Sequence, residues 1–117
     1  MRKVFKVSEV PFSAVPPPRT GFVKWLINKE IVGDKQLPVG LGLLMYKQGQ
    51  KTELHSNPPI TEMLYVLRGK GRVIIDGESF EVEPNTAIYL PSGSKHSIEN
   101  VGDDELHYLF VSCPPPI

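Results

Sequence analysis

The residues from Gly49 to Gly69 read GQKTELHSNPPITEMLYVLRG, which is two short strand-like runs separated by a pair of prolines. Side chains two positions apart on a strand point to the same face, so His55 and Asn57 are expected to point together. Pro58-Pro59 ends the first run, because proline cannot donate a hydrogen bond in a β-ladder. The following strand then brings Glu62 back toward the same region.

A second stretch, from Pro84 to Asn100, reads PNTAIYLPSGSKHSIEN and has the same strand–turn–strand character. His96 lies on its second strand and shares a face with Ile98 and Asn100. Two imidazoles and one carboxylate are donors that a divalent transition metal prefers. We therefore expect the polar groups of the two hairpins to converge inside one barrel.

The rest of the chain also reads as short strands, rich in Val, Ile, Leu, Tyr and Phe and bounded by turn residues. Asp76-Gly77 is a two-residue hairpin signal. Lys24 to Val32 comes nearest to a helical pattern, but its β-branched residues and the following Gly33-Asp34 argue against a helix. Such closely spaced strands imply a sandwich or barrel. The expected strands span residues 5–7, 21–27, 41–46, 52–56, 62–68, 72–75, 78–82, 86–90, 95–100 and 106–112.

Size and charge restrict the function classes. A chain of 117 residues is the usual size of one domain, and 40% apolar content is enough for a core. The 13 basic residues balance the 13 acidic residues, so there is no electrostatic case for nucleic acid or an anionic membrane as a partner. The longest apolar run, Leu41 to Tyr46, is too short to span a bilayer.

The single cysteine, Cys113, cannot form an internal disulfide, and the basic N-terminus lacks the apolar stretch of a signal peptide. These features predict a soluble protein of the cytoplasm. Two proline triplets, Pro16-Pro17-Pro18 and Pro114-Pro115-Pro116, are interpreted as an extended linker and tail, because proline presets the backbone.

The spacing of the two stretches resembles the two motifs of the cupin superfamily, whose members are small double-stranded β-helix or jelly-roll proteins. The first motif is a Gly, a His-x-His, a Glu and a closing Gly, which here correspond to Gly49, His55-Ser56-Asn57, Glu62 and Gly69. The second is a Gly, a Pro-x-Gly, a His and an Asn, which here correspond to Asn85, Pro91-Ser92-Gly93, His96 and Asn100.

The resemblance implies an all-β fold, a jelly-roll barrel that forms a single cupin domain over residues 1–117. Residues 1–20 would supply an N-terminal strand and proline-rich arm, residues 21–113 the barrel and residues 114–117 the tail. It also implies one divalent transition metal, such as Fe, Mn, Ni or Zn, bound by His55, Glu62 and His96.

Two residues depart from the motifs. Asn85 replaces a Gly, and asparagine tolerates a left-handed backbone, so the turn can survive. Asn57 stands where most metal-binding cupins have their second His. Asn57 can coordinate the ion weakly or face it through water, or the site can have three ligands like the facial triad of non-haem iron proteins. A hydrogen-bonded cluster without metal is the remaining alternative.

Further candidates for the pocket are His107, Tyr46, Tyr89 and Glu53. His107 is a candidate fourth ligand or general base on the last strand. The tyrosines can offer a phenol to a ligand, and Glu53 has the strand parity of His55.

The expected function is that of a small metalloenzyme acting on a small organic substrate. It would be dioxygenase-like with iron, and an isomerase or lyase with another divalent metal. A non-catalytic small-molecule-binding or sensor protein and a metal-free structural relative are the alternatives. The resemblance also implies a homodimer, for which Phe5 to Val7 is a candidate exchanged strand.

Overall fold

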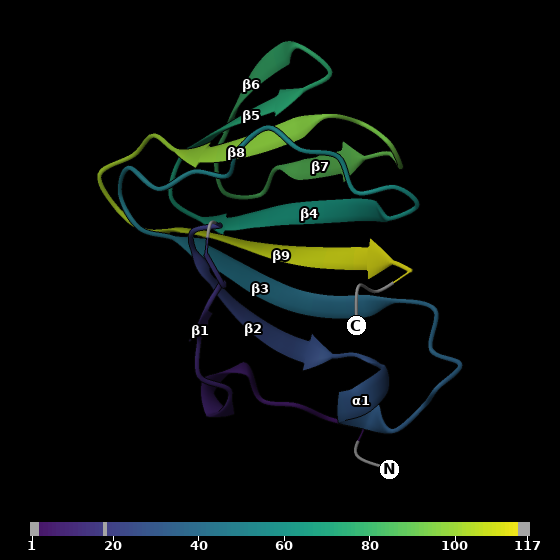
Figure 1. Ribbon diagram of the computed structural model, residues 1–117. Coiled ribbons are helices and arrows are strands. Elements are labelled where there is room, and N and C mark those ends of the chain that lie inside the picture. The colour runs from purple at the N-terminus through teal and green to yellow at the C-terminus, as the bar shows by residue number, and fades with distance from the viewer. Residues whose placement is uncertain (1–2, 18, 115–117) are drawn as a thin grey trace.

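Two antiparallel sheets face one another in the computed structural model, which describes residues 3–17 and 19–114 (Figure 1). The larger sheet contains, in spatial order, β1 (Ser13–Ala14), β2 (Phe22–Ile27), β3 (Gly40–Tyr46), β9 (Leu106–Cys113), β4 (Thr61–Arg68) and β7 (Ala87–Leu90). The smaller sheet contains β6 (Glu78–Val82), β5 (Gly71–Ile75) and β8 (His96–Asn100). This arrangement confirms the predicted all-β barrel.

The core lies between the two sheets. Along β4, Leu64 and Val66 are buried, whereas Met63, Tyr65 and Leu67 are exposed, as the period of two predicts. Each fully buried aliphatic side chain contributes about 1.5–3 kcal/mol to folding. The central cluster consists of Tyr46, Leu64, Val66, Val73, Val82, Ile88, Leu90, Ile98, Leu106, Tyr108 and Phe110.

The turns follow the local sequence signals. Asp76 and Gly77 both have positive φ, 47° and 85°, which is the backbone of a type I′ hairpin between β5 and β6. Asn85 has a φ of 69°, so it adopts the left-handed conformation predicted for this position. These turns fix the register of the strands on either side.

The strand expected over residues 52–56 is not formed. His55 and Lys51 make only isolated bridges, to His96 and Glu99. The amide of Ile98 donates to the Thr52 side-chain oxygen, at 2.9 Å, while the amide of Thr52 donates to the carbonyl of Ile98. A side-chain oxygen thus takes the place of a main-chain acceptor and interrupts the ladder.

Two further expectations are wrong. Residues 5–7 do not form a strand, and a 3-10 turn, η1 (Val7–Glu9), follows instead; β1 takes the edge of the sheet beside β2. A one-turn helix, α1 (Lys29–Val32), is present where none was expected. The side chain of Asn28 accepts a hydrogen bond from the amide of Ile31, and Gly33 is left-handed at the other end, so both ends are capped.

The N-terminal arm is partly built into the sheet, because β1 pairs with β2 of the same chain. Met1, Arg2, Pro18 and the tail residues 115–117 lie outside the described residues, so each proline triplet is only partly described. Across the described part of the chain, no helix has the length and apolar character needed to cross a membrane.

Candidate functional site

His55 and His96 lie side by side, although 40 residues of chain separate them. Their backbones exchange two hydrogen bonds, 3.0 Å from the His55 amide and 2.8 Å from the His96 amide. Their ring centroids are 4.4 Å apart at an interplanar angle of 62°. The turn before His96 is fixed by Asp76, whose side chain accepts a hydrogen bond from the Lys95 amide at 2.9 Å.

The Nδ1 atom of each histidine ring is hydrogen-bonded to a backbone carbonyl. The Nδ1 of His55 lies 2.7 Å from the carbonyl of Glu53, and the Nδ1 of His96 lies 3.3 Å from the carbonyl of Ser94. A carbonyl only accepts, so Nδ1 is the donor in each contact and Nε2 is the ring nitrogen left for a ligand. Histidine ligands of metals are commonly oriented by such a second hydrogen bond.

Glu62 reaches the same region from β4, where it lies between Leu90 of β7 and Ser112 of β9. Burial raises the pKa of its carboxyl, and this is opposed by the nearby His55, by Arg19 and by a hydrogen bond from Asn57. Burial, followed by repulsion from His55, lowers the pKa of His96. Both shifts reflect a site that penalises uncompensated charge.

The three predicted ligands line one small cavity of about 40 Å³, together with Tyr46 and Tyr108. Two imidazoles and a carboxylate that line one space are, as donor types, suited to a divalent transition metal. As the side chains stand, no three His, Cys, Asp or Glu residues among residues 3–17 and 19–114 are close enough together to hold a metal ion. A metal ion could be held here only if the side chains moved closer together.

A larger cavity of about 460 Å³ adjoins the small one, since Glu62 and Tyr46 line both. Asn57 lines the larger cavity and also a third cavity of about 300 Å³, which we call the mouth cavity. The mouth cavity is lined by Arg19, Thr20, Lys51, Thr52, Glu53, His55 and Asn57. The walls of the larger cavity are mainly apolar and include Val15, Val23, Trp25, Leu44, Ile60 and Phe110. A space of this size and character is typical of a site for a small organic molecule.

Arg19 lines all three cavities. Nothing in its local sequence predicts a site, because it follows a proline-rich segment far from either motif. Its position depends on the pairing of β1 with β2, which folds the arm back along the edge of the larger sheet. A sequence signal for this pairing is absent, since Ser13 and Ala14 form only a two-residue strand.

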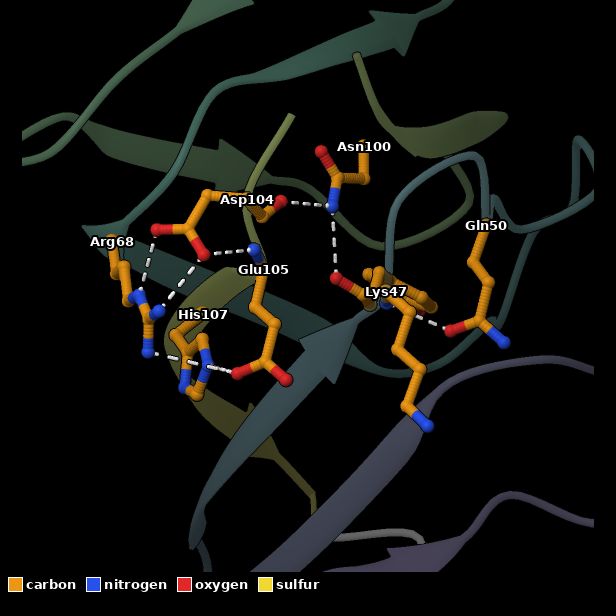
Figure 2. Close-up of polar contacts among 8 residues, drawn as sticks. Lys47, Gln50, Arg68, Asn100, Asp104, Glu105 and His107 are labelled. Atoms are coloured by element: carbon orange, nitrogen blue, oxygen red, sulfur yellow. Dashed lines mark hydrogen bonds and ion pairs between the residues drawn. The ribbon is translucent and has the colours of Figure 1, made fainter. Parts of the chain in front are cut away.

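The other predicted pocket residues separate into two groups. Tyr46 lines the small and large cavities, and Glu53 lines the mouth cavity. Tyr89 is 62% exposed and lines none of the three cavities. His107 also lies outside them: its Nε2 is 2.9 Å from a carboxylate oxygen of Glu105, as Figure 2 shows.

Comparison with known proteins identifies the family. The model for the cupin domain matches residues 42–112, which is more than half of the chain. This range contains both motif stretches and the strands from β4 to β8. The chain belongs to the cupin family.

Relatives have diverse names. An uncharacterized protein, MJ1618, of Methanocaldococcus jannaschii is 42% identical over 67 residues, which is 57% of this chain and 54% of that protein. The polyketide synthase protein CurC of Streptomyces cyaneus is 31% identical over 96 residues, 82% of this chain and 61% of that protein. The chain thus spans little more than half the length of these curated relatives.

A solved structure covers the whole fold. The crystal structure of a predicted oxalate decarboxylase from Thermotoga maritima superimposes with a TM-score of 0.81 and is 26% identical. The match covers 97% of this chain and 100% of that chain. The arm and the barrel described above therefore both belong to an arrangement that a solved protein shares.

Proposed function

We propose that this cupin binds one divalent transition metal through His55, Glu62 and His96 and acts on a small organic molecule held in the larger cavity. The observation that carries the proposal is the common small cavity of the three side chains, which opens toward an apolar space. Asn57 would stand beside the ion, because its amide is also engaged with Glu62.

The metal, when bound, supplies Lewis acidity that polarises a carbonyl or acidifies water. The donor set suits Fe, Mn, Ni or Zn. With iron, we propose an oxidative reaction of a small organic compound with dioxygen as co-substrate. With another of these metals, an isomerase or lyase reaction is the proposal. Each reaction class is a proposal about this cavity, because cupin folds carry many chemistries.

Tyr46 would orient the bound molecule. The hydroxyl of Tyr108 donates to the hydroxyl of Tyr46 across 3.3 Å, so the Tyr46 proton remains available to another acceptor. Burial, only partly offset by the hydrogen bond from Tyr108, raises the pKa of Tyr46 and keeps it protonated. Tyr46 can therefore donate a hydrogen bond to a substrate oxygen lying between the small and large cavities.

A binding protein without turnover is the second candidate. The side chains of His55, Glu62 and His96 are not closed around a common point, which favours a metal-free polar cluster beneath a ligand cavity. Elemental analysis of protein purified without added metal separates the two. About one equivalent of a transition metal in this protein supports the metal-dependent function. If the protein is then supplemented with metal and still holds less than about a tenth of an equivalent, the metal-dependent function is contradicted.

Histidine variants make this test specific. His96→Ala should lose the metal, because the site then retains only one imidazole and one carboxylate. His107→Ala is the matched control, since His107 contacts Glu105 outside the three cavities and should leave metal content unchanged. Retention of metal by His96→Ala would show that the ion is bound elsewhere.

Turnover is tested separately, by oxygen consumption and product analysis with catechols, thiols, diketones and keto acids. Turnover that requires both the metal and His96 supports an enzyme. Tight binding of one of these compounds with no change in it supports the binding protein instead. The two readouts use the same metal-loaded preparation, so they can be compared directly.

A further inference from the structure

Arg19 is held over the cavities by its neighbours on the arm. The hydroxyl of Thr20 donates to the carbonyl of Lys51 at 2.6 Å, which ties the arm to the loop that carries His55. The amide of Arg19 donates to the carbonyl of Pro16, and the amide of Val15 donates to the carbonyl of Gly21. Two backbone hydrogen bonds and one side-chain hydrogen bond thus fix the backbone that presents the guanidinium.

The guanidinium of Arg19 has no direct partner in the described part of the chain. Among the residues that the structure describes, Arg19 makes no side-chain hydrogen bond and no ion pair within 4.0 Å, unlike Arg68 and Arg72, which pair with carboxylates. A guanidinium offers a planar fork of donors that matches a carboxylate in a bidentate pair. Arg19 acts on the Glu62 carboxyl only through its charge, so the donors of the guanidinium remain available to an anionic group from outside the chain.

The walls beside Arg19 indicate the rest of the ligand. Trp25 and Phe110 pack edge to face, with ring centroids 5.0 Å apart, and Leu44 and Ile60 complete an apolar surface. A dicarboxylate as small as oxalate would leave most of the 460 Å³ unfilled. The cavity matches a molecule that has one charged end and an aromatic or branched apolar body.

We propose that the larger cavity binds an organic monocarboxylic acid, with its carboxylate on Arg19 and its apolar body against Trp25 and Phe110. This ligand proposal shares one premise with the proposed function, which is that the ligand lies in the larger cavity. Contact between carboxylate and guanidinium does not itself require a metal, so binding can be measured with and without the ion.

The experiment uses the fluorescence of Trp25, the sole tryptophan of the chain. The probes are 3-phenylpropionate, benzoate, 4-methylpentanoate and oxalate, together with 3-phenylpropionamide as the neutral match to the first acid. At least one apolar acid should bind at or below about 1 mM, and 3-phenylpropionate should bind about tenfold or more tightly than its amide. Oxalate should bind more weakly than 3-phenylpropionate.

Arg19→Gln should remove the preference for the acid over the amide and leave amide binding unchanged. Arg19→Lys should retain part of the preference, because it keeps the charge without the planar fork. Lys51→Gln is the matched control: Lys51 lines only the mouth cavity, so this variant should keep the preference. Thermal unfolding of each variant confirms that the fold is intact.

Several results would overturn the proposal. The first three are equal binding of 3-phenylpropionate and its amide, tightest binding by oxalate, and no binding of any apolar acid below about 10 mM. The fourth is that Lys51→Gln loses the preference for the acid as fully as Arg19→Gln does. Titrations with chelator-treated and metal-supplemented protein separate the two proposals. If the protein takes up no metal but still prefers the acid, only the metal-dependent function is rejected. If the protein takes up metal but does not prefer the acid, only this ligand class is rejected.

Discussion

Asn57 is the residue at which this chain departs most from the metal-binding motif of its family. Its amide is hydrogen-bonded to Glu62, so it can orient that carboxylate without binding the metal itself. An amide oxygen is a weaker donor to a transition metal than an imidazole nitrogen. In the proposed metal site, three residues would therefore be firm ligands and Asn57 would be a fourth, weak one.

Asn57→His should strengthen metal binding by about tenfold or more, because it supplies a second imidazole beside His55. Asn57→Ala should weaken binding by less than His96→Ala does. Competition of each variant with a chromogenic chelator measures both effects. Equal losses in Asn57→Ala and His96→Ala would show that the asparagine is itself a required ligand.

The buried position of Tyr108 predicts that the folded protein loses stability in alkaline solution. Burial, followed by the proximity of Tyr46, raises the pKa of Tyr108 well above the ordinary tyrosine value of 10.0. Below that pH Tyr108 is protonated in both the folded and unfolded states. Above it, the unfolded chain ionises first, so the folded protein loses stability as the pH rises.

Melting temperatures measured from pH 8 to pH 11 test this expectation. Tyr108→Phe should be less stable by about 1 kcal/mol near neutrality, because it loses the bond to Tyr46. Its stability should fall less steeply above pH 10 than that of the parent protein. Tyr89→Phe, at an exposed position, is the control and should follow the parent profile. Parallel profiles for the parent protein and Tyr108→Phe would contradict the account.

Among the connections between elements, the one from β8 to β9 is fixed by Asn100, which is only 2% exposed. Its side-chain nitrogen donates to the carbonyl of Tyr46 at 2.9 Å and to the carbonyl of Asp104 at 2.8 Å. Figure 2 shows the contact between Asn100 and Asp104. Its oxygen accepts from the amide of Gly102 at 3.0 Å. One side chain thus joins the end of β3 to the turn between β8 and β9.

Asn100→Ala should destabilise the protein by about 2–4 kcal/mol, because one buried and two partly buried hydrogen bonds to the backbone are lost. Asn100→Asp tests the donors alone, since it keeps the acceptor but cannot donate to either carbonyl. Urea unfolding measures both, with Ser92→Ala as an exposed control. A loss below about 1 kcal/mol for Asn100→Ala would show that water replaces these contacts.

Elements with local signals were predictable from the sequence, and those that depend on distant contacts were not. The alternation of β4 and the Asp76-Gly77 turn specify their own structure. The segment around Thr52 has strand-like residues, yet it does not form a strand, because the side chain of Thr52 accepts a hydrogen bond from the distant Ile98 amide. Arg19 reaches the site only because β1 lies against β2, a pairing that two residues cannot signal.

The whole molecule has an exposed apolar surface on the outer side of β4 and β7, formed by Met63, Tyr65, Leu67 and Tyr89. β7 is also the last strand of its sheet, so its outer edge is open within the described chain. Open edges and apolar surfaces of this kind are commonly covered by a partner. We propose that a second copy covers this surface in a symmetric dimer.

Light scattering should give a mass about twice the 13.1 kDa of the chain at micromolar concentration. Met63→Glu should shift the protein to the monomer, because it places a charge within the apolar surface. Glu78→Gln, at the exposed start of β6, is the control. A parent protein that is monomeric at this concentration would reject the dimer.

The proposed function depends on whether His55, Glu62 and His96 bind one ion together. A crystal structure of metal-supplemented protein, with anomalous scattering recorded at the absorption edge of the metal, tests this directly. The account predicts one anomalous peak at about 2.0–2.2 Å from the Nε2 atoms of both histidines and a Glu62 oxygen. No peak among these side chains, or a peak bound by other residues alone, would contradict it.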